Sequence, residues 1–144
     1  MAALNLVVIS GLSGSGKSHA LKAFEDAGYF CVDNLPPALL PTFVELCHQQ
    51  GGEIKNVALG IDIRERVFFG DLAKVLGELK AQGHALQLVF LEAREEVLVR
   101  RFSESRRPHP LLPHMPVVEG VRFERERLSE LRKHADRVID TSNI

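Results

Sequence analysis

Residues 11–18 combine the residue types that can surround a phosphate group, in the spacing G-x-x-x-x-G-K-[ST]. Glycines permit positive φ, so that several backbone N–H groups can converge on one anion, and the Lys17 ammonium adds a positive charge. The Ser18 hydroxyl can ligate Mg²⁺. We therefore predict that this loop binds the phosphates of ATP or GTP together with Mg²⁺. The predicted binding residues are Gly11, Leu12, Ser13, Gly14, Ser15, Gly16, Lys17 and Ser18.

A magnesium ion at such a loop is usually oriented by a carboxylate at the end of a neighbouring strand. Three acidic residues follow apolar runs: Asp33, Asp62 and Glu92. Asp62 follows the cleaner run and has Arg64 beside it, so we favour Asp62 as the second metal residue after Ser18. Asp33 could instead be a turn or cap residue, because short acidic side chains hydrogen-bond readily to nearby backbone.

Cationic side chains gather around a proline-rich segment at Arg100, Arg101, Arg106, Arg107 and His109. Prolines at positions 108, 110, 113 and 116 cannot continue a helix, so the segment must be a loop. Such a loop could close over a nucleotide as a lid, with an arginine stabilising transferred charge. The alternative is an ordinary solvated surface with pairing to Glu104. The predicted catalytic residues are Lys17, Asp62, Arg106 and Arg107.

Short apolar runs that alternate with helical patterns predict the elements that position these residues. A strand over 4–9 enters the glycine loop, and a helix follows from Ser18 to a cap at Gly28. Further strands are predicted at 29–32, 56–63, 86–91 and 138–139, and further helices at 41–51, 72–79, 95–102 and 121–135. Five apolar strands with intervening helices predict an α/β fold with a doubly wound, mostly parallel sheet and helices on both faces.

The last predicted helix has an apolar face formed by Val121, Leu128, Leu131 and Ala135. Glutamates stand three residues before cations at Glu124/Arg127 and Glu130/Lys133. We expect both pairs to form ion pairs on the solvated side of the helix.

The composition indicates one folded domain. The chain has 144 residues, 45% of them hydrophobic, and a formal charge of -1, which provides no overall field toward nucleic acid or anionic membrane. The two cysteines, Cys31 and Cys47, lie among apolar residues and predict buried free thiols. The start of the chain lacks signal-peptide features, and no apolar run reaches about 18 residues, so we expect a cytoplasmic protein without membrane contact.

Several segments, taken in order, resemble the RapZ/YvcJ family of bacterial nucleotide-binding proteins. They are residues 11–18, Val32-Asp33-Asn34-Leu35-Pro36, Asp62-Ile63-Arg64, Arg100-Arg101-Phe102-Ser103-Glu104 with Arg106-Arg107-Pro108-His109-Pro110-Leu111, and Ile139-Asp140-Thr141-Ser142. The resemblance spans nearly the whole chain. The phosphate loop alone would indicate only a superfamily, whereas the Val-Asp-Asn-Leu-Pro and Arg-Arg-x-His-Pro-Leu segments, in this order, indicate the family.

The resemblance implies a P-loop kinase-like domain over residues 1–144 that binds ATP and GTP and has NTPase activity. It also implies a GTP contact at Asp62, Ile63, Arg64 and Glu65, although the family is expected to have a small polar residue where this chain has Glu65.

In the family, a C-terminal RNA-binding domain follows, and we expect that it is absent from this chain. Enterobacterial members act as RNase adapters: they present a small regulatory RNA to a ribonuclease and so tune glucosamine-6-phosphate synthesis. We expect these partners to act only through the full-length protein, which could form a homo-oligomer.

Two other functions fit the residues. Residues 88–101 with the arginine loop also look like the strand, helix and lid of nucleoside monophosphate, gluconate or shikimate kinases, in which case Asp33 would bind the acceptor. Alternatively, nucleotide occupancy only sets the pose of an attached RNA-binding domain. No Asn-Lys-x-Asp motif is present, which leaves the choice between ATP and GTP open.

Overall fold

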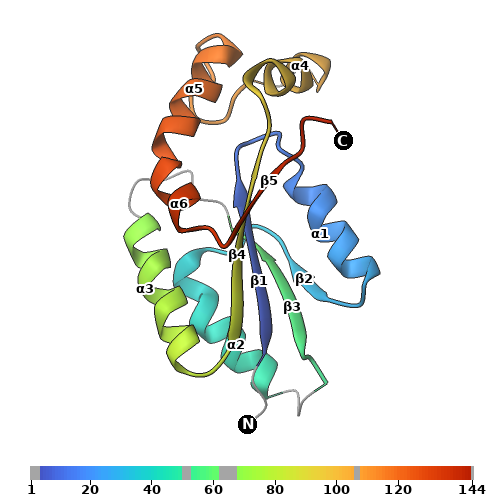
Figure 1. The fold of residues 1–144 in the computed structure, drawn as a ribbon, viewed down its shortest axis with the longest axis vertical. Coiled ribbons are helices and arrows are strands. Elements are labelled where there is room, and N and C mark those ends of the chain that lie inside the picture. Colours follow the sequence, from blue (N-terminus) through green and yellow to red (C-terminus); the bar gives the residue numbers. More distant parts are fainter. Residues whose placement is uncertain (1–3, 50–52, 62–67, 106–107, 144) are drawn as a thin grey trace.

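The computed structural model describes residues 4–49, 53–61, 68–105 and 108–143. They form one β-sheet with helices packed on both faces (Figure 1). The strands are β1 (Asn5–Gly11), β2 (Phe30–Val32), β3 (Asn56–Gly60), β4 (Ala85–Glu92) and β5 (Arg137–Asp140). The helices are α1 (Lys17–Asp26), a 3-10 turn (Pro37–Leu39), α2 (Leu40–His48), α3 (Phe68–Ala81), α4 (Glu95–Ser105), α5 (Val117–Arg127) and α6 (Ser129–His134).

The sheet has the strand order β2-β3-β1-β4-β5, and its strand pairs are parallel. The central strand β1 places Val8 opposite Leu59 of β3 and Leu88 of β4. From β1 the chain passes to the edge strand β2, returns to β3 beside β1, and then crosses to β4 and β5 on the other side of β1. The carboxyl end of β1 therefore lies near the reversal of strand order, where doubly wound sheets bind ligands. The predicted doubly wound, five-stranded α/β fold is confirmed.

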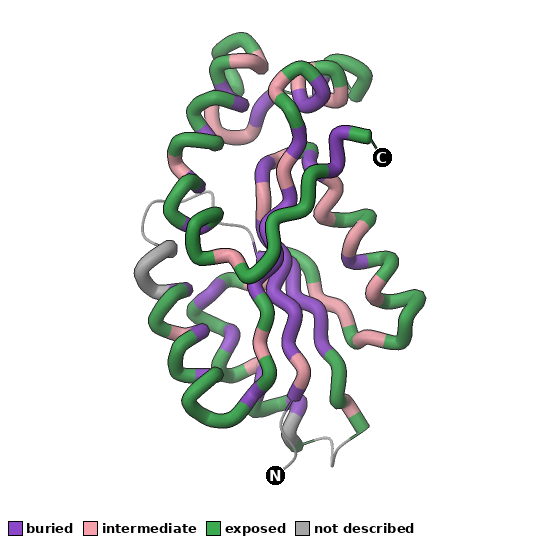
Figure 2. Tube along the Cα trace, in the orientation of Figure 1, coloured by how far each residue is buried: buried purple, intermediate pink, exposed green. Residues whose placement is uncertain are grey.

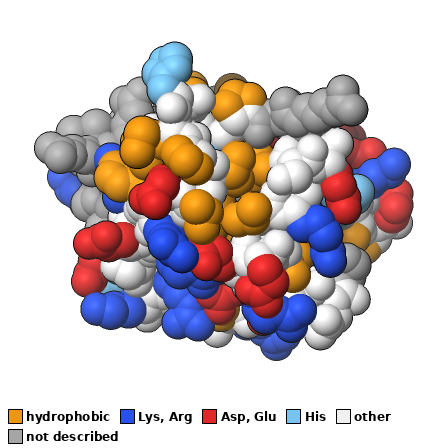
Figure 3. Space-filling model, turned by 90° about the horizontal axis from the view of Figure 1, so that it is seen from above, with side chains coloured by type: hydrophobic (Ala, Val, Ile, Leu, Met, Phe, Trp, Pro, Cys, Tyr) orange, Lys and Arg blue, Asp and Glu red, His pale blue; other side chains and the backbone are white. Residues whose placement is uncertain are grey.

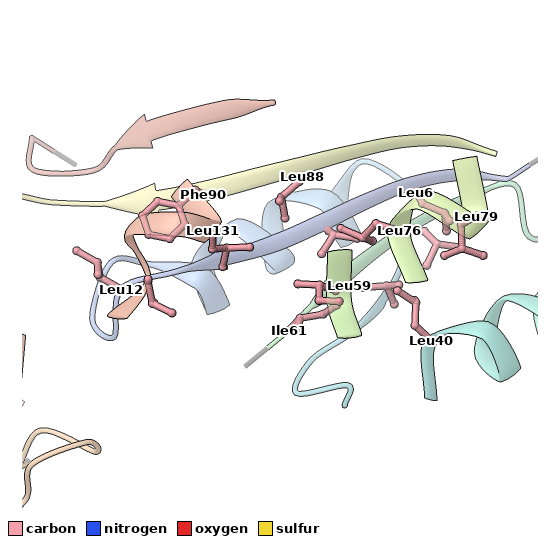
Figure 4. Close-up of a cluster of buried hydrophobic side chains, with 14 of the residues drawn as sticks. Leu6, Leu12, Leu40, Leu59, Ile61, Leu76, Leu79, Leu88, Phe90 and Leu131 are labelled. Carbon is pink, nitrogen blue, oxygen red and sulfur yellow. The ribbon is translucent and has the colours of Figure 1, made fainter. Parts of the chain in front are cut away.

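Alternate side chains of β1 enter two different hydrophobic clusters, which explains why this strand is continuously apolar from Leu6 to Ile9. Leu6 and Val8 face the cluster that includes α2, α3 and α6. Figure 4 shows Leu6 beside Leu76 and Leu79 of α3. Val7 and Ile9 face the other cluster, in which Leu21 of α1 packs on the sheet. Both faces of the central strands are therefore buried, as Figure 2 shows.

The edge strand β5 differs from the central strands because all four of its residues are exposed (Figure 2). It follows a helical region that the sequence predicts as one helix over 121–135. The structure instead has two helices, because Leu128 leaves helical geometry at φ -93° and ψ 5°. The apolar face is nevertheless retained: Val121, Leu128 and Leu131 are all buried.

Both cysteines are free thiols, but only Cys47 is fully buried and Cys31 is half-buried. Burial raises the pKa of each thiol, which lowers the fraction of reactive thiolate. No helix within the described ranges is long and apolar enough to cross a bilayer.

Candidate phosphate-binding site

The glycine loop connects the carboxyl end of β1 to the first residue of α1, as the sequence predicts. Gly14 and Gly16 have φ values of 82° and 102°, which other residues rarely adopt. Gly11 is required for a different reason: a Cβ atom there would lie 2.3 Å from the carbonyl oxygen of Leu91 on β4. The loop thus combines a bent backbone with close packing against the neighbouring strand.

Two carbonyl groups of the loop are held by donors from distant parts of the chain. Arg101 of α4 donates from Nη1 to the carbonyl oxygen of Gly14 at 2.8 Å. The Thr141 hydroxyl, just after β5, donates to the carbonyl oxygen of Ser15 at 2.6 Å. Arg101 also donates to the Thr141 carbonyl oxygen at 2.6 Å, so the two residues that bind the loop are hydrogen-bonded to each other. These acceptors are therefore satisfied by protein groups.

The amide groups on the helix side of the loop, unlike these carbonyl groups, make no hydrogen bond to the described part of the chain. No acceptor in the described part of the chain receives a hydrogen bond from the amides of Gly16, Lys17 or Ser18. These groups form the N-terminus of α1, where amide dipoles favour an anion. Lys17 is half-buried and makes no ion pair with a described residue, and Ser18 is exposed. The arrangement fits a phosphate group, with the Ser18 hydroxyl accessible to a cation.

The three candidate carboxylates have different surroundings. Glu92 forms ion pairs with Arg132 at 2.9 Å and Arg125 at 3.6 Å, so its negative charge is already compensated. Asp33 is exposed and lies against Gly60 at the end of β3, because a Cβ atom on Gly60 would be 2.4 Å from its Oδ1. Its Oδ1 also accepts a hydrogen bond from the Asn34 amide at 2.7 Å, which is the turn role that the sequence offers as the alternative, at the same edge of the sheet as the loop.

Several predicted residues lie outside the described part of the chain. They are Asp62, Ile63, Arg64 and Glu65 after β3, and Arg106 and Arg107 after α4. Their assigned roles stay predictions. The preceding residue Ile61 is described, and its amide donates to the carbonyl oxygen of Ile9 at 3.0 Å, so the chain enters this region beside β1.

The described cations near the proline-rich segment do not form a uniform basic surface. Arg100 lies 3.9 Å from Glu104, the pairing that the sequence offers as the alternative to a lid, and Arg101 binds the loop. The expectation of a surface cation at His109 is wrong, because its side chain is fully buried. Seen from above, the end with α4 and α5 carries charges of both signs side by side (Figure 3).

The loop has one further contact that the sequence analysis missed, at Glu124 of α5. The expected surface pair with Arg127 is wrong: Glu124 is only 4% exposed, and Arg127 instead lies over the ring of Phe123. The Glu124 carboxylate accepts hydrogen bonds from the Ser13 amide at 2.6 Å and the Ser13 hydroxyl at 2.7 Å. A signal was present, because Glu124 lies three residues after Val121 and so falls on the apolar face of the helix. The other expected pair, Glu130 with Lys133, is confirmed at 3.3 Å.

Comparison with protein families identifies the domain. Residues 4–144 match the model described as RapZ-like N-terminal domain. The chain belongs to this family. It is 49% identical over 141 residues to a nucleotide-binding protein of Clostridium botulinum, and this matched region covers 98% of the chain and 48% of that protein. It is 52% identical over 144 residues to one of Desulforudis audaxviator, which covers 100% of the chain and 49% of that protein. This RapZ-like domain thus spans about half the length of these relatives.

Solved structures support the fold assignment. A shikimate kinase of Bacteroides thetaiotaomicron is similar with a TM-score of 0.65 and 18% identity, covering 96% of this chain and 88% of that one. A gluconokinase of Sinorhizobium meliloti gives a TM-score of 0.57 and 21% identity, covering 100% of this chain and 86% of that one. The RapZ-like domain therefore has a P-loop kinase-like fold.

Proposed function

We propose that this domain binds ATP or GTP with Mg²⁺ at residues 11–18 and hydrolyses the nucleotide slowly. The observation that carries the proposal is the division of the loop into two sets of groups. Its carbonyl oxygens at Gly14 and Ser15 are bound by protein donors, whereas the amides of Gly16, Lys17 and Ser18 donate no hydrogen bond to any described residue. The relatives named nucleotide-binding proteins support the binding of a nucleotide.

Each predicted residue has a physical role in this proposal. The Lys17 ammonium and the open amides bind phosphate oxygens. Ser18 and Asp62 hold Mg²⁺, which offsets phosphate charge when bound. Arg106 and Arg107 stabilise the charge that develops during phosphoryl transfer, and Asp62, Ile63, Arg64 and Glu65 contact the nucleotide.

At the level of the whole protein, we propose a regulatory role. Residues 1–144 form the nucleotide-binding domain, and an RNA-binding domain follows in the full-length chain. Nucleotide occupancy then controls an adapter that presents a small regulatory RNA to a ribonuclease in the cytoplasm and tunes amino-sugar metabolism. A homo-oligomer is compatible with this role.

A lysine substitution tests the proposed function. Lys17→Ala should abolish binding of ATP and GTP in the presence of Mg²⁺, measured by calorimetry, because the loop loses its only side-chain cation. Lys22→Ala is the matched control, since Lys22 is an exposed lysine on the same helix. Equal affinity of Lys17→Ala and wild-type protein would remove the central support for the proposal.

A second candidate is a small-molecule kinase, and the position of Asp33 favours it. This exposed carboxylate at the end of β2 could bind the hydroxyl of an acceptor. A screen with labelled ATP over sugars, amino sugars and nucleotides distinguishes the candidates. An acceptor phosphorylated much faster than water, with loss of transfer in Asp33→Asn, would favour the kinase; phosphate release alone would favour the regulatory NTPase.

A further inference from the structure

A buried polar chain links the phosphate loop to the proline-rich segment through α5. Ser13 in the loop donates two hydrogen bonds to Glu124, one to each carboxylate oxygen. On the other side, Oε1 of Glu124 lies 3.4 Å from Nε2 of His109. The side chain of Glu124 is 5% exposed and that of His109 is 0% exposed, so both are buried.

The hydrogen bonds of His109 determine which nitrogen faces Glu124 with a proton. Its Nδ1 accepts a hydrogen bond from the Leu111 amide at 3.1 Å and therefore carries no proton. The ring proton must lie on Nε2, which is directed toward the carboxylate. Nε2 makes no hydrogen bond within the described part of the chain, and the Glu124 carboxylate lies 3.4 Å from it.

Close packing holds the same residues in place. The His109 ring packs on Phe102 of α4 with a centroid separation of 5.2 Å. Gly120 of α5 makes room for the imidazole, because a Cβ atom there would lie 2.4 Å from its Cγ. At the loop, a Cβ atom on Gly14 would meet the Phe102 ring at 3.3 Å. Ser13, Glu124, His109 and Phe102 therefore form a closed path of contacts that returns to the loop.

We propose that Glu124 is a positioning residue: it fixes the Ser13 side of the phosphate loop and joins it to His109, so that the loop holds its nucleotide-binding shape before the ligand arrives. The proposal rests on the nucleotide-binding function proposed above. Its physical basis is preorganisation, because a loop that is already ordered loses less conformational entropy on binding. A carboxylate buried to this extent is costly unless its hydrogen bonds are made, which the two Ser13 donors accomplish.

Binding of Mg²⁺ with ATP to the full chain tests the proposal. Glu124→Leu removes both acceptors and should weaken the affinity by about 10-fold to 100-fold, the effect of one or two lost charge-assisted hydrogen bonds. Glu124→Gln should retain most of the affinity, because its amide can accept from the Ser13 N–H and donate to the Ser13 hydroxyl. Glu126→Gln is the matched control, since Glu126 is an exposed glutamate on the same helix.

A double-mutant cycle separates positioning from a general loss of packing. Ser13→Ala alone should weaken binding, and the Ser13→Ala, Glu124→Leu double variant should bind as weakly as Glu124→Leu alone. Independent, multiplying effects would overturn the proposal. Should Glu124→Leu fail to fold, judged by circular dichroism, Ser13→Ala carries the test, and unchanged affinity in that variant overturns it.

The outcomes distinguish this proposal from the function on which it rests. If wild-type protein and Glu126→Gln both fail to bind either nucleotide, the proposed function fails. If wild-type protein binds and Glu124→Leu binds equally well, only the positioning role fails. Hydrogen exchange of the ligand-free protein adds a direct readout: the amide of Ser13 should exchange faster in Glu124→Leu than in wild-type protein.

Discussion

At the scale of single residues, the space around His109 depends on one glycine. Gly120 lies within α5, where glycine costs stability relative to alanine. Its absence of a side chain is required because a Cβ atom would come within 2.4 Å of Cγ and 2.5 Å of Cβ of His109. Gly77 provides the contrast: it also lies within a helix, α3, but a Cβ atom there would meet nothing within 4 Å.

These two glycines give opposite predictions for the same substitution. Gly120→Ala should lower the free energy of unfolding by about 1–3 kcal/mol, because the methyl group displaces a fully buried imidazole. Gly77→Ala should raise it by about 0.4–1 kcal/mol, because the unfolded chain loses conformational freedom without any clash. Urea denaturation of both variants measures the difference. An equal change in the two variants would contradict the packing of His109 against α5.

At the scale of elements, the segment after β5 supports the phosphate loop through hydrogen bonds. Thr141 is buried and its hydroxyl donates to Ser15, while Arg101 donates to both its hydroxyl and its carbonyl oxygen. The strand β5 is itself exposed, so its position depends on pairing with β4 and on this contact.

Removing the Thr141 hydroxyl should therefore weaken the link between β5 and the loop. Thr141→Val leaves the Ser15 carbonyl oxygen without its donor and should reduce the free energy of unfolding by about 1–3 kcal/mol. Thr42→Val, at an exposed position of α2, should change it by less than about 0.5 kcal/mol. Thermal and urea unfolding give both values. A similar small effect at the two positions would show that the hydrogen bond from Thr141 to Ser15 contributes little to stability.

The elements were also the part of the fold that could be predicted most reliably from the sequence. Continuous apolar strands such as 4–9 identify a parallel sheet, and the glycine loop identifies its own place between β1 and α1. The hydrogen-bond partners of that loop could not be predicted, because Glu124 and Thr141 are distant from it in the chain. The helical spacing places Glu124 on the apolar face of its helix, but it does not identify Ser13 as the partner. Glu124 became buried because α5 turns it toward Ser13, which only the tertiary arrangement reveals.

At the scale of the whole molecule, surface charges of both signs contribute to stability in a pH-dependent way. The Arg122 guanidinium on α5 donates to Glu95 on α4 and holds the pKa of that carboxyl below its ordinary value of 4.5. The Ser142 hydroxyl, and then its amide, lower the pKa of Asp140 below 3.8. Both groups are exposed, so salt should screen the charged contribution.

The direction of these shifts predicts acid sensitivity. Between the lowered folded pKa and the ordinary value, the unfolded chain binds more protons, so stability rises with pH and is lost as pH falls through this range. Glu95→Gln should lose stability less steeply than wild-type protein between about pH 5 and pH 3. Glu78→Gln, at an exposed position of α3, should keep the wild-type slope. Urea midpoints across this range provide the measurement, and parallel curves for Glu95→Gln and wild type would refute the prediction.

The distance in sequence between the phosphate loop and its hydrogen-bond partners Glu124 and Thr141 has a consequence for how the protein is made. Ser13 is 111 residues before Glu124, and Ser15 is 126 residues before Thr141. Since synthesis proceeds from the N-terminus, the ribosome releases the loop long before it releases Glu124 or Thr141. A growing chain can form β1 and α1 early, yet its loop lacks the full set of these hydrogen bonds until Thr141 has emerged. The ligand affinity of nascent chains of increasing length should therefore reach its full value only after residue 141 is free.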